Sequence, residues 1–557
     1  MKLKTKKNLL IYAIPALAAL LVRVLLLINW WDSPVRWYCN ISGLDMQTIL
    51  QTAEWLYNGE TTFALYKAIL TAILFLNKGA TCPEAVVIIQ LISGIFIAPL
   101  VAWCTLRLWG KTYWALASGL LAALYAPAMM YQVLILKESI LLFFALLSLT
   151  AVLWAHKHHF SSKALWICGI FLALACICRM NALPFCGLAS LWIIACLFKK
   201  LKGVKKTILF RTSFLALGIL TVFVPISIIN ACLTEGSSFL PVQMPSIEYI
   251  SKLGSIVNPT SMNVSLTTPK TTSPKATNGF MFNMARKVPS IFSASEIPNN
   301  VNYYFLKDKL FPLQYLIGPF LLIPLAVTAL ILLIFNRGIL RKESILFVFI
   351  FSYMLPMCYF VPLARYRLVL IPVFCMLAPY PVFTVWKAWH NKKLLWVLLP
   401  IMLWAIILYI NLPLNSFLRA TDFVSYGKGI QFKTGKSTSA LPYFYEAYQK
   451  TKTEETIVNF AWFLIKNRSP KDAVAVLLPA FKKSPNNLAY RYYLGIAYFF
   501  TGQTEKAEQL FSKINPDDME GLKAKYYYFY ENSLRAQNKH KAADKLHQRA
   551  LKDRNGK

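Results

Sequence analysis

Long apolar runs separated by short polar turns dominate the first 411 residues. A helix needs roughly 17–25 mostly apolar residues to cross a bilayer. Eleven runs match this pattern: 8–29, 85–106, 113–131, 135–155, 164–178, 182–198, 207–229, 313–335, 344–360, 367–386 and 394–411. The first run is long and lacks a small-residue cleavage site, so it is interpreted as an anchor and not as a removable signal peptide. The pattern predicts an all-α, polytopic membrane protein with about eleven transmembrane helices.

Composition supports this class and excludes a mainly water-soluble protein. Apolar residues make up 57% of the chain and charged residues 15%, whereas soluble domains carry roughly 45–50% and about 25%. The chain has 59 Lys and Arg against 24 Asp and Glu, which gives a net charge of +35. Such an excess usually indicates nucleic acid or an anionic surface, so its meaning depends on where the charges lie.

The basic residues cluster in every second turn between the apolar runs. The clusters are Lys2, Lys4, Lys6 and Lys7; Arg107 and Lys111; Lys157 and Lys163; Lys199, Lys200, Lys202, Lys205, Lys206 and Arg211; Arg337, Arg341 and Lys342; and Lys387, Lys392 and Lys393. Cytoplasmic loops of membrane proteins carry this bias. Of the eleven acidic residues before 412, all except Glu343 lie in the opposite set of turns. We therefore predict a cytoplasmic N-terminus and an extracytoplasmic C-terminus, and no nucleic-acid partner.

This topology places three long segments outside the cytoplasm. They are the first external loop, 30–84, the second, 230–312, and the region beyond 411. Within the second loop, residues 257–279 are rich in Ser, Thr, Pro and Asn and are predicted to be flexible. The expected domains are a membrane domain, 1–411, and a soluble helical domain, 412–557.

The soluble tail contains an internal repeat. Gly427, Ala461 and Gly495 recur every 34 residues, and an Ala-x3-apolar pattern follows each of them. This period and these small residues resemble the tetratricopeptide repeat, with about three units and a degenerate fourth. The resemblance implies an α-solenoid whose helices pack closely and whose concave face binds a protein partner. A spacer or stabilising cap is the alternative, since the tail's 24 basic and 13 acidic residues also suit a merely solvated surface.

The first external loop carries the leading catalytic candidate. Asp45 precedes apolar positions at helical spacing, and a second apolar segment runs from Phe63 to Leu76. Both segments are predicted to be helices at the outer membrane interface. By itself Ser42-x-x-Asp45 is also a capping-box pattern, in which Asp45 would serve only to start a helix.

The order of these features resembles the GT-C membrane glycosyltransferases that use polyprenyl-phosphate sugars. Protein O-mannosyltransferases and the lipid A aminoarabinose transferase belong to this group. The resemblance rests on Asp45 in the first loop and on the motif 364–368, ARYRL, followed by Pro372. In place of the family's frequent Asp-Glu pair, Met46 follows Asp45, and Ala64 replaces a common proline. The resemblance implies Asp45 as general base, with Glu60, Tyr66 and Tyr366 in the substrate pocket. For Glu60, a solvated helix face is the alternative.

Physical chemistry supports the same site. An acceptor hydroxyl loses its proton as it attacks the sugar, and a carboxylate within hydrogen-bond reach accepts that proton. Asp45 is the first candidate and Glu138 the second, although Glu138 also suits a local ion pair with Lys137. The phosphate that leaves requires cations where its charge develops. Arg365, Arg367, Arg179 and Lys137 lie on the acid-rich outer side, against the overall bias; anchoring to lipid headgroups is their alternative role.

Metals, nucleotides and disulfides receive less support. The six His and eleven Cys form no metal-binding pattern, and there is no Walker-type phosphate loop. No cofactor is required, although a divalent metal shared by Asp45 and Glu138 is left open. Cys39 and Cys82 lie in one external loop, where a disulfide is permitted; the sequence does not decide whether they are bonded.

The sequence therefore predicts an integral-membrane glycosyltransferase that transfers a sugar, with inversion, from a polyprenyl-phosphate donor to an acceptor hydroxyl on the extracytoplasmic side. The acceptor is a protein, lipid or glycan, and the tail recruits it or a partner. A bacterial inner membrane, with the tail in the periplasm, is expected. The alternatives are a polymerase or ligase for lipid-linked glycans, a flippase, and a non-catalytic scaffold. The sequence names neither the sugar nor the acceptor, and it does not determine the oligomeric state.

Overall fold

The computed structural model describes residues 2–57, 65–76, 82–201, 204–233, 280–336, 342–360, 362–410, 418–519 and 522–555. Over these residues the chain is helical and forms no β-sheet. It divides into two compact units, Met1–Phe417 and Leu418–Lys557. The predicted all-α class is confirmed, while the boundary expected between 411 and 412 lies outside the described residues.

Six helical segments of the described chain are long and apolar enough to cross a membrane. They are Leu9–Trp31, Pro83–Trp109, Glu138–Lys157, Met180–Lys200, Lys205–Cys232 and Ala364–His390. The other five predicted spans overlap shorter apolar helices: Thr112–Ala123, Ser162–Cys178, Pro319–Ile334, Ser344–Tyr359 and Leu394–Tyr409. Each predicted span therefore contains an apolar helix, but only six of these helices have the length that a membrane crossing requires by itself.

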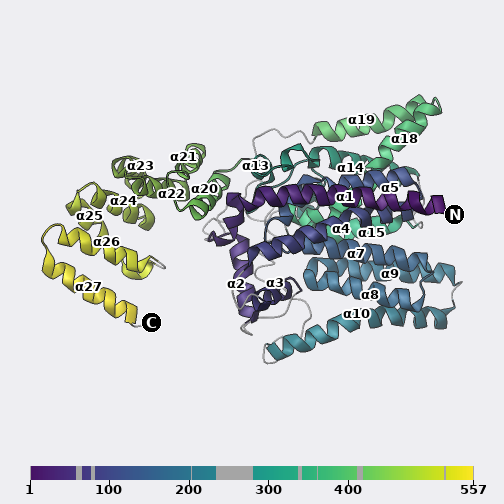
Figure 1. The fold of residues 1–557 in the computed structure, drawn as a ribbon, viewed down its shortest axis with the longest axis horizontal. Helices are drawn as coiled ribbons and strands as arrows, with labels where there is room; N and C mark the ends of the chain where they lie inside the picture. The colour runs from purple at the N-terminus through teal and green to yellow at the C-terminus, as the bar shows by residue number, and fades with distance from the viewer. Residues whose placement is uncertain are drawn as a thin grey trace. The chain divides into compact units, whose positions relative to one another are not determined.

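The helices of the first unit run side by side in Figure 1. Their bounds are α1 (Lys2–Trp31), α4 (Pro83–Trp109), α5 (Thr112–Ala123), α6 (Ala126–Gln132), α7 (Glu138–Lys157), α8 (Ser162–Cys178), α9 (Leu183–Lys200), α10 (Lys205–Leu233), α14 (Pro319–Asn336), α15 (Ser344–Tyr359), α16 (Ala364–Arg367), α17 (Ile371–Leu377), α18 (Pro379–His390) and α19 (Leu394–Ile410). Prolines at the starts of α6, α17 and α18 coincide with the breaks in two predicted spans, because proline lacks the N–H that would continue the preceding helix.

Helices α8 and α10 approach each other closely because each has a glycine at their contact. A Cβ added to Gly218 of α10 would stand 2.1 Å from the carbonyl oxygen of Trp166 in α8, and one added to Gly169 of α8 would stand 2.3 Å from that of Leu215. Small residues of this kind let membrane helices pack backbone against backbone. The α8–α10 contact therefore tolerates no side chain at either position.

Contacts at the two ends of α4 join turns of the two sets that differ in charge. At the end of α4, Lys342 donates a hydrogen bond to the carbonyl oxygen of Arg107 at 3.1 Å, so two of the basic turns meet. At the start of α4, Arg36 forms an ion pair with Glu84 at 2.6 Å, which joins two parts of the first external loop. At α4, turns of one predicted set thus meet one another; the topology of the whole chain stays a prediction.

The first external loop begins with a 3-10 helix, Pro34–Asn40, and continues with α2 (Asp45–Tyr57) and α3 (Leu65–Leu76). Figure 1 shows α2 and α3 at the end of the bundle away from the N-terminus. Asp45 is the first residue of α2, as its alternative role of starting a helix requires, but the capping box with Ser42 is not formed. It requires Ser42 at the helix cap, but Gly43 adopts a left-handed turn with φ +89° and α2 begins only at Asp45.

In the second external loop the described part begins with α12 (Phe280–Ile291) and continues through α13 (Tyr303–Leu306). The flexible segment predicted at 257–279 lies outside the described residues. Lys287 of α12 is buried and donates to the carbonyl oxygens of Tyr359 and Phe360 at 3.3 and 2.7 Å. A cation suits the exposed carbonyls at the C-terminus of a helix, so Lys287 fastens α12 to the end of α15.

Both cysteines of the first external loop are free thiols in the structure. Cys39 Sγ lies 3.4 Å from the side-chain oxygen of Asn40, and Cys82 Sγ lies 3.7 Å from Oε2 of Glu84. The disulfide that the sequence permitted is therefore not formed.

The described residues of the second unit form four helical hairpins. The helices are α20 (Ala420–Thr434), α21 (Leu441–Lys450), α22 (Glu454–Lys466), α23 (Pro470–Lys483), α24 (Leu488–Phe500), α25 (Thr504–Phe511), α26 (Lys523–Arg535) and α27 (His540–Asn555). A Cβ at Gly427 would lie 2.9 Å from the ring of Phe444, and one at Gly495 would lie 2.7 Å from that of Phe511. At two of the three positions spaced by 34 residues, Gly427 and Gly495, the first helix of a hairpin thus admits an aromatic ring from the second.

Candidate functional site

Charged side chains from four separate helix ends meet at one end of the first unit. Asp45 begins α2, Glu138 begins α7, Arg179 follows α8 and Arg365 lies in α16. Arg365 Nη1 donates to Oδ2 of Asp45, and its Nε lies 3.7 Å from Oε1 of Glu138. Arg179 Nη1 donates to the same Glu138 oxygen at 2.5 Å. We call Asp45, Glu138, Arg179 and Arg365 the charged cluster.

Exposure within the charged cluster rises from Glu138 to Asp45. The side chain of Glu138 is 3% exposed, those of Arg179 and Arg365 are 13% and 16%, and that of Asp45 is 40%. A buried carboxylate is stable only with close cationic partners, and Glu138 has two. Glu138 is therefore placed to hold the two guanidinium groups, while Asp45 is the carboxylate that an incoming molecule can reach.

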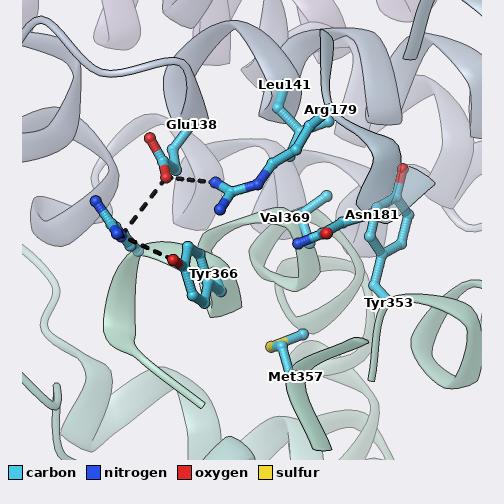
Figure 2. A pocket seen from close by; sticks show the side chains of 9 residues that line it. Glu138, Leu141, Arg179, Asn181, Tyr353, Met357, Tyr366 and Val369 are labelled. Atoms are coloured by element: carbon cyan, nitrogen blue, oxygen red, sulfur yellow. Dashed lines mark hydrogen bonds and ion pairs between the residues drawn. The ribbon is translucent and has the colours of Figure 1, made fainter. Parts of the chain in front are cut away.

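Tyr366 contacts both arginines of the charged cluster. The guanidinium carbons of Arg179 and Arg365 lie 4.3 and 4.9 Å from the centre of its ring, within the range of cation–π attraction. Its hydroxyl also accepts a hydrogen bond from Arg365 Nη2 at 2.9 Å. Figure 2 shows the ring beside Glu138 and Arg179. Of the three predicted substrate-pocket residues, Tyr366 is the one that the structure places at the charged cluster.

A pocket opens beside the charged cluster (Figure 2). It is lined by Glu138, Leu141, Arg179, Asn181, Tyr353, Met357, Arg365, Tyr366 and Val369. Two cations and one anion thus share a small space with phenolic, amide and apolar side chains. Charged, polar and apolar side chains thus meet at one small hollow of the first unit.

Lys137 is the residue that precedes α7, and it lies next to the charged cluster. The protein that surrounds its ammonium group removes part of its hydration, and Arg179 repels its charge; together they lower its pKa to about 8. The side chain keeps an exposed surface. A lysine with this pKa loses its charge in a mildly alkaline solution, in contrast to the arginines.

Arg367 has different surroundings from Arg365. Its side chain is buried, and Nη2 forms an ion pair with Glu296 at 2.9 Å. It also donates to the carbonyl oxygens of Ser293 and of Ser295, the latter at 3.0 Å. Tyr125 donates to the same Glu296 at 2.9 Å. Arg367 does not line the pocket; it binds the chain that follows α12, although the sequence predicted it as a phosphate ligand beside Arg365.

The remaining predicted pocket residues are not placed. Glu60 lies outside the described residues, and Tyr66 belongs to α3 but its side chain is not among those described.

The two acidic candidates do not fit a shared metal ion. Among the residues that the structure describes, no group of three or more His, Cys, Asp or Glu side chains could hold one. Asp45 and Glu138 each bind Arg365, so a divalent cation between them would have to stand against a guanidinium group. The repulsion between these like charges disfavours such a site.

Asn181 and Tyr353 also line the pocket, and local sequence pattern did not single them out. Asn181 stands two residues after Arg179 in a short outer turn, so its position near a predicted cation was a usable signal. Tyr353 lies inside an apolar run of α15, where an aromatic residue usually indicates packing only. Its importance depends on where α15 meets α9, which no local pattern reveals.

Comparisons with known proteins gave a family match for part of the tail and a similarity to a solved structure. A tetratricopeptide-repeat family model matches residues 464–526. A search of curated proteins found no match. Among solved structures, the chain is similar to the archaeal oligosaccharyltransferase AglB from Archaeoglobus fulgidus in complex with an inhibitory peptide and a dolichol-phosphate, with a TM-score of 0.39 and 13% identity. The match covers 76% of this chain and 56% of that one, so this chain spans little more than half the length of that enzyme. The second unit thus contains a tetratricopeptide-repeat region.

Proposed function

We propose that the protein is an integral-membrane glycosyltransferase that uses a polyprenyl-phosphate sugar as donor and a hydroxyl group as acceptor. The charged cluster carries the proposal, because it combines an accessible carboxylate with two guanidinium groups at one end of a bundle of apolar helices. A lipid-linked donor would keep its polyprenyl chain in the bilayer and bring its phosphate to that end.

Phosphate release is the step that Arg365 and Arg179 would assist. As the bond between the sugar and the phosphate breaks, negative charge gathers on the phosphate oxygens. Guanidinium groups donate paired hydrogen bonds to such oxygens and remain charged at every physiological pH. Glu138 and Tyr366 hold the two groups in place before the donor arrives, so little reorganisation would be needed during the reaction.

Asp45 would act as the general base. The acceptor oxygen forms a bond to the anomeric carbon, the bond from this carbon to the phosphate oxygen breaks, and the acceptor proton passes to Asp45. Attack from the side opposite the phosphate inverts the anomeric centre. Arg365 donates a hydrogen bond to Asp45; a donor phosphate would compete for that guanidinium and leave the carboxylate available for the proton. Donor would then bind before acceptor.

Other residues have supporting roles in this proposal. Arg367 and Glu296 position the chain that follows α12, and Lys137 adds a positive charge near the phosphate. Arg23, within the first span, donates to Gln132 Oε1 at 2.9 Å and to two backbone carbonyls. Its hydrogen bonds lie within the protein, which favours a structural role over a place on a transport pathway.

The repeat region of the tail would recruit the acceptor or a partner protein, since solenoids of this kind present an extended concave surface. The expected location of the charged cluster and the tail is the extracytoplasmic side of a bacterial inner membrane. This follows from the positive-inside pattern and belongs to the proposal.

Sugar transfer by the purified full-length chain tests the function directly. Asp45→Asn should abolish most turnover with radiolabelled polyprenyl-phosphate sugar, and Arg365→Ala should raise the donor concentration that is required. Glu84→Gln and Arg36→Ala are matched controls, because this ion pair lies in the same external loop but does not line the pocket. Full activity of correctly folded Asp45→Asn removes Asp45 as the base. An unchanged donor requirement in Arg365→Ala counts against the phosphate site.

A further inference from the structure

The short helix α16, which carries Arg365, is bonded at both of its ends to one part of the second external loop. We call this part, residues 291–297, the docked segment. The amide of Ala364, the first residue of α16, donates to the carbonyl oxygen of Ile297 at 3.2 Å. The guanidinium of Arg367, its last residue, donates to further carbonyl oxygens of the docked segment. Arg365 lies between these two attachments.

A buried carboxylate holds Arg367 in this position. Oε1 of Glu296 lies 2.9 Å from Nη2 of Arg367, and it accepts a hydrogen bond at 2.9 Å from the hydroxyl of Tyr125, the residue that precedes α6. Tyr125 is 0% exposed, and Glu296 and Arg367 are each 3% exposed. Electrostatic contacts are stronger where little water competes for them. We call these three residues the buried anchor, because they attach α16 and the docked segment to the start of α6.

Two sets of contacts determine where the guanidinium of Arg365 lies. Asp45 and Glu138 orient the end of its side chain, whereas the backbone of α16 fixes the point from which that side chain starts. Arg365 and Arg367 belong to the same four-residue helix, so a shift of Arg367 also moves this starting point. A misplacement of about 1 Å, caused by a mutation far from the reacting atoms, can cost about 10²-fold in rate.

We infer that Glu296, together with Tyr125 and Arg367, positions Arg365 so that its guanidinium meets the phosphate of the donor without rearrangement. The inference rests on the proposed function, because it requires Arg365 to bind that phosphate. It also gives the docked segment of the second external loop a part in donor binding. The three residues of the buried anchor are not among those that line the pocket, so they are positioning residues and not catalytic ones.

Binding of citronellyl phosphate, a short isoprenoid phosphate without a sugar, to the full-length protein in detergent tests the inference. Tyr125→Phe removes one oxygen atom and its hydrogen bond to Glu296, so it should weaken binding roughly 2- to 10-fold, the range for one hydrogen bond. Glu296→Gln also removes the charge that holds Arg367, so it should weaken binding at least as much. Should Glu296→Gln not fold, Tyr125→Phe decides alone, because it keeps the ion pair.

Tyr527→Phe is the matched control. Tyr527 is 3% exposed and donates to Oδ2 of Asp553 at 2.6 Å, so this variant also removes a buried hydroxyl from a carboxylate. Because Tyr527 belongs to the second unit, Tyr527→Phe should bind citronellyl phosphate as the wild type does.

A double-mutant cycle with Arg365→Ala separates positioning from a general structural role. Two residues that act through one group have non-additive effects. Tyr125→Phe should therefore raise the Kd in the wild-type background and leave it unchanged in the Arg365→Ala background. A loss of folded protein alone would lower the number of binding sites equally in both backgrounds and would not change the Kd.

The inference is overturned if either folded variant, Tyr125→Phe or Glu296→Gln, keeps the wild-type Kd. It is also overturned if Tyr125→Phe has the same effect with and without Arg365. Failure of the proposed function gives a different result, namely equal binding of citronellyl phosphate by the wild type and by Arg365→Ala.

Discussion

Neutralising the two carboxylates of the charged cluster should have opposite consequences for stability and catalysis. Asp45 is 40% exposed and its partner Arg365 is 16% exposed. A partly exposed ion pair contributes about 0.2–1 kcal/mol to stability, so Asp45→Asn should lower the free energy of unfolding by less than about 1 kcal/mol. Loss of a general base should nevertheless reduce kcat by about 10²- to 10⁴-fold.

For Glu138→Gln we expect the reverse, namely a large loss of stability and a smaller loss of turnover. Its carboxylate is 3% exposed, lies 2.5 Å from Arg179 and is 3.7 Å from Nε of Arg365. Removing one partner from a buried ion pair typically costs about 3–5 kcal/mol, and here two guanidinium groups lose their shared anion. The variant should therefore lose about 3 kcal/mol or more of unfolding free energy. Its folded fraction should still turn over, with a raised KM for donor because the arginines are less well held.

The assay pairs equilibrium unfolding in detergent micelles, followed by tryptophan fluorescence, with transfer kinetics of the folded protein. Glu84→Gln is the control, since its carboxylate is 20% exposed and binds Arg36 at 2.6 Å. The reasoning about burial is refuted if Glu138→Gln unfolds within about 1 kcal/mol of wild type or if Asp45→Asn is destabilised equally. Retention of wild-type kcat by Asp45→Asn refutes the assignment of the base.

Three further predictions concern charge and packing. The pKa of Lys137 is lowered to about 8, so its positive charge is present below that pH and lost above it. The affinity for donor should therefore fall between about pH 7 and 9 in the wild-type protein. Lys137→Arg should abolish this fall, and a pH series of donor KM for both proteins checks it. Arg367→Met should cost about 3–5 kcal/mol of unfolding free energy by leaving Glu296 buried without its cation, and a raised donor KM at unchanged stability would show that Arg367 binds phosphate instead. Gly218→Leu should destabilise the first unit by at least about 1–3 kcal/mol through the clash with α8, whereas Gly187→Leu, where a Cβ meets nothing within 4 Å, should not; equal thermal stability of the two variants would contradict the packing argument.

Local pattern was sufficient for the helical framework. Each predicted span contains an apolar helix, because hydrophobic length is a property of consecutive residues. The 34-residue recurrence of small residues located the hairpins of the tail for the same reason: Gly495 must admit the ring of Phe511, and this requirement repeats with the unit. The division of charge between alternate turns likewise needed no knowledge of tertiary contacts.

The sequence also selected Asp45, Glu138, Arg179 and Arg365 as chemically important, but it could not say which of them meet. Asp45 and Arg365 are 320 residues apart, and their pairing depends on how the bundle places the ends of α2 and α16. Local pattern offered a capping role for Asp45 and a neighbouring Lys137 for Glu138; the tertiary structure supplied a distant arginine for each.

Arg365 and Arg367 show most clearly that local sequence pattern does not reveal which residues a side chain contacts. They belong to one short motif and were predicted to share one role, yet Arg365 lines the pocket while Arg367 is buried against Glu296. Two positions apart on a helix, their side chains leave the axis at widely different angles. The sequence by itself determined which segments are apolar, which repeat and where unusual charges lie, because these are local properties. Only the packing of helices distant in sequence decided which charges are paired, which are buried and which face the pocket.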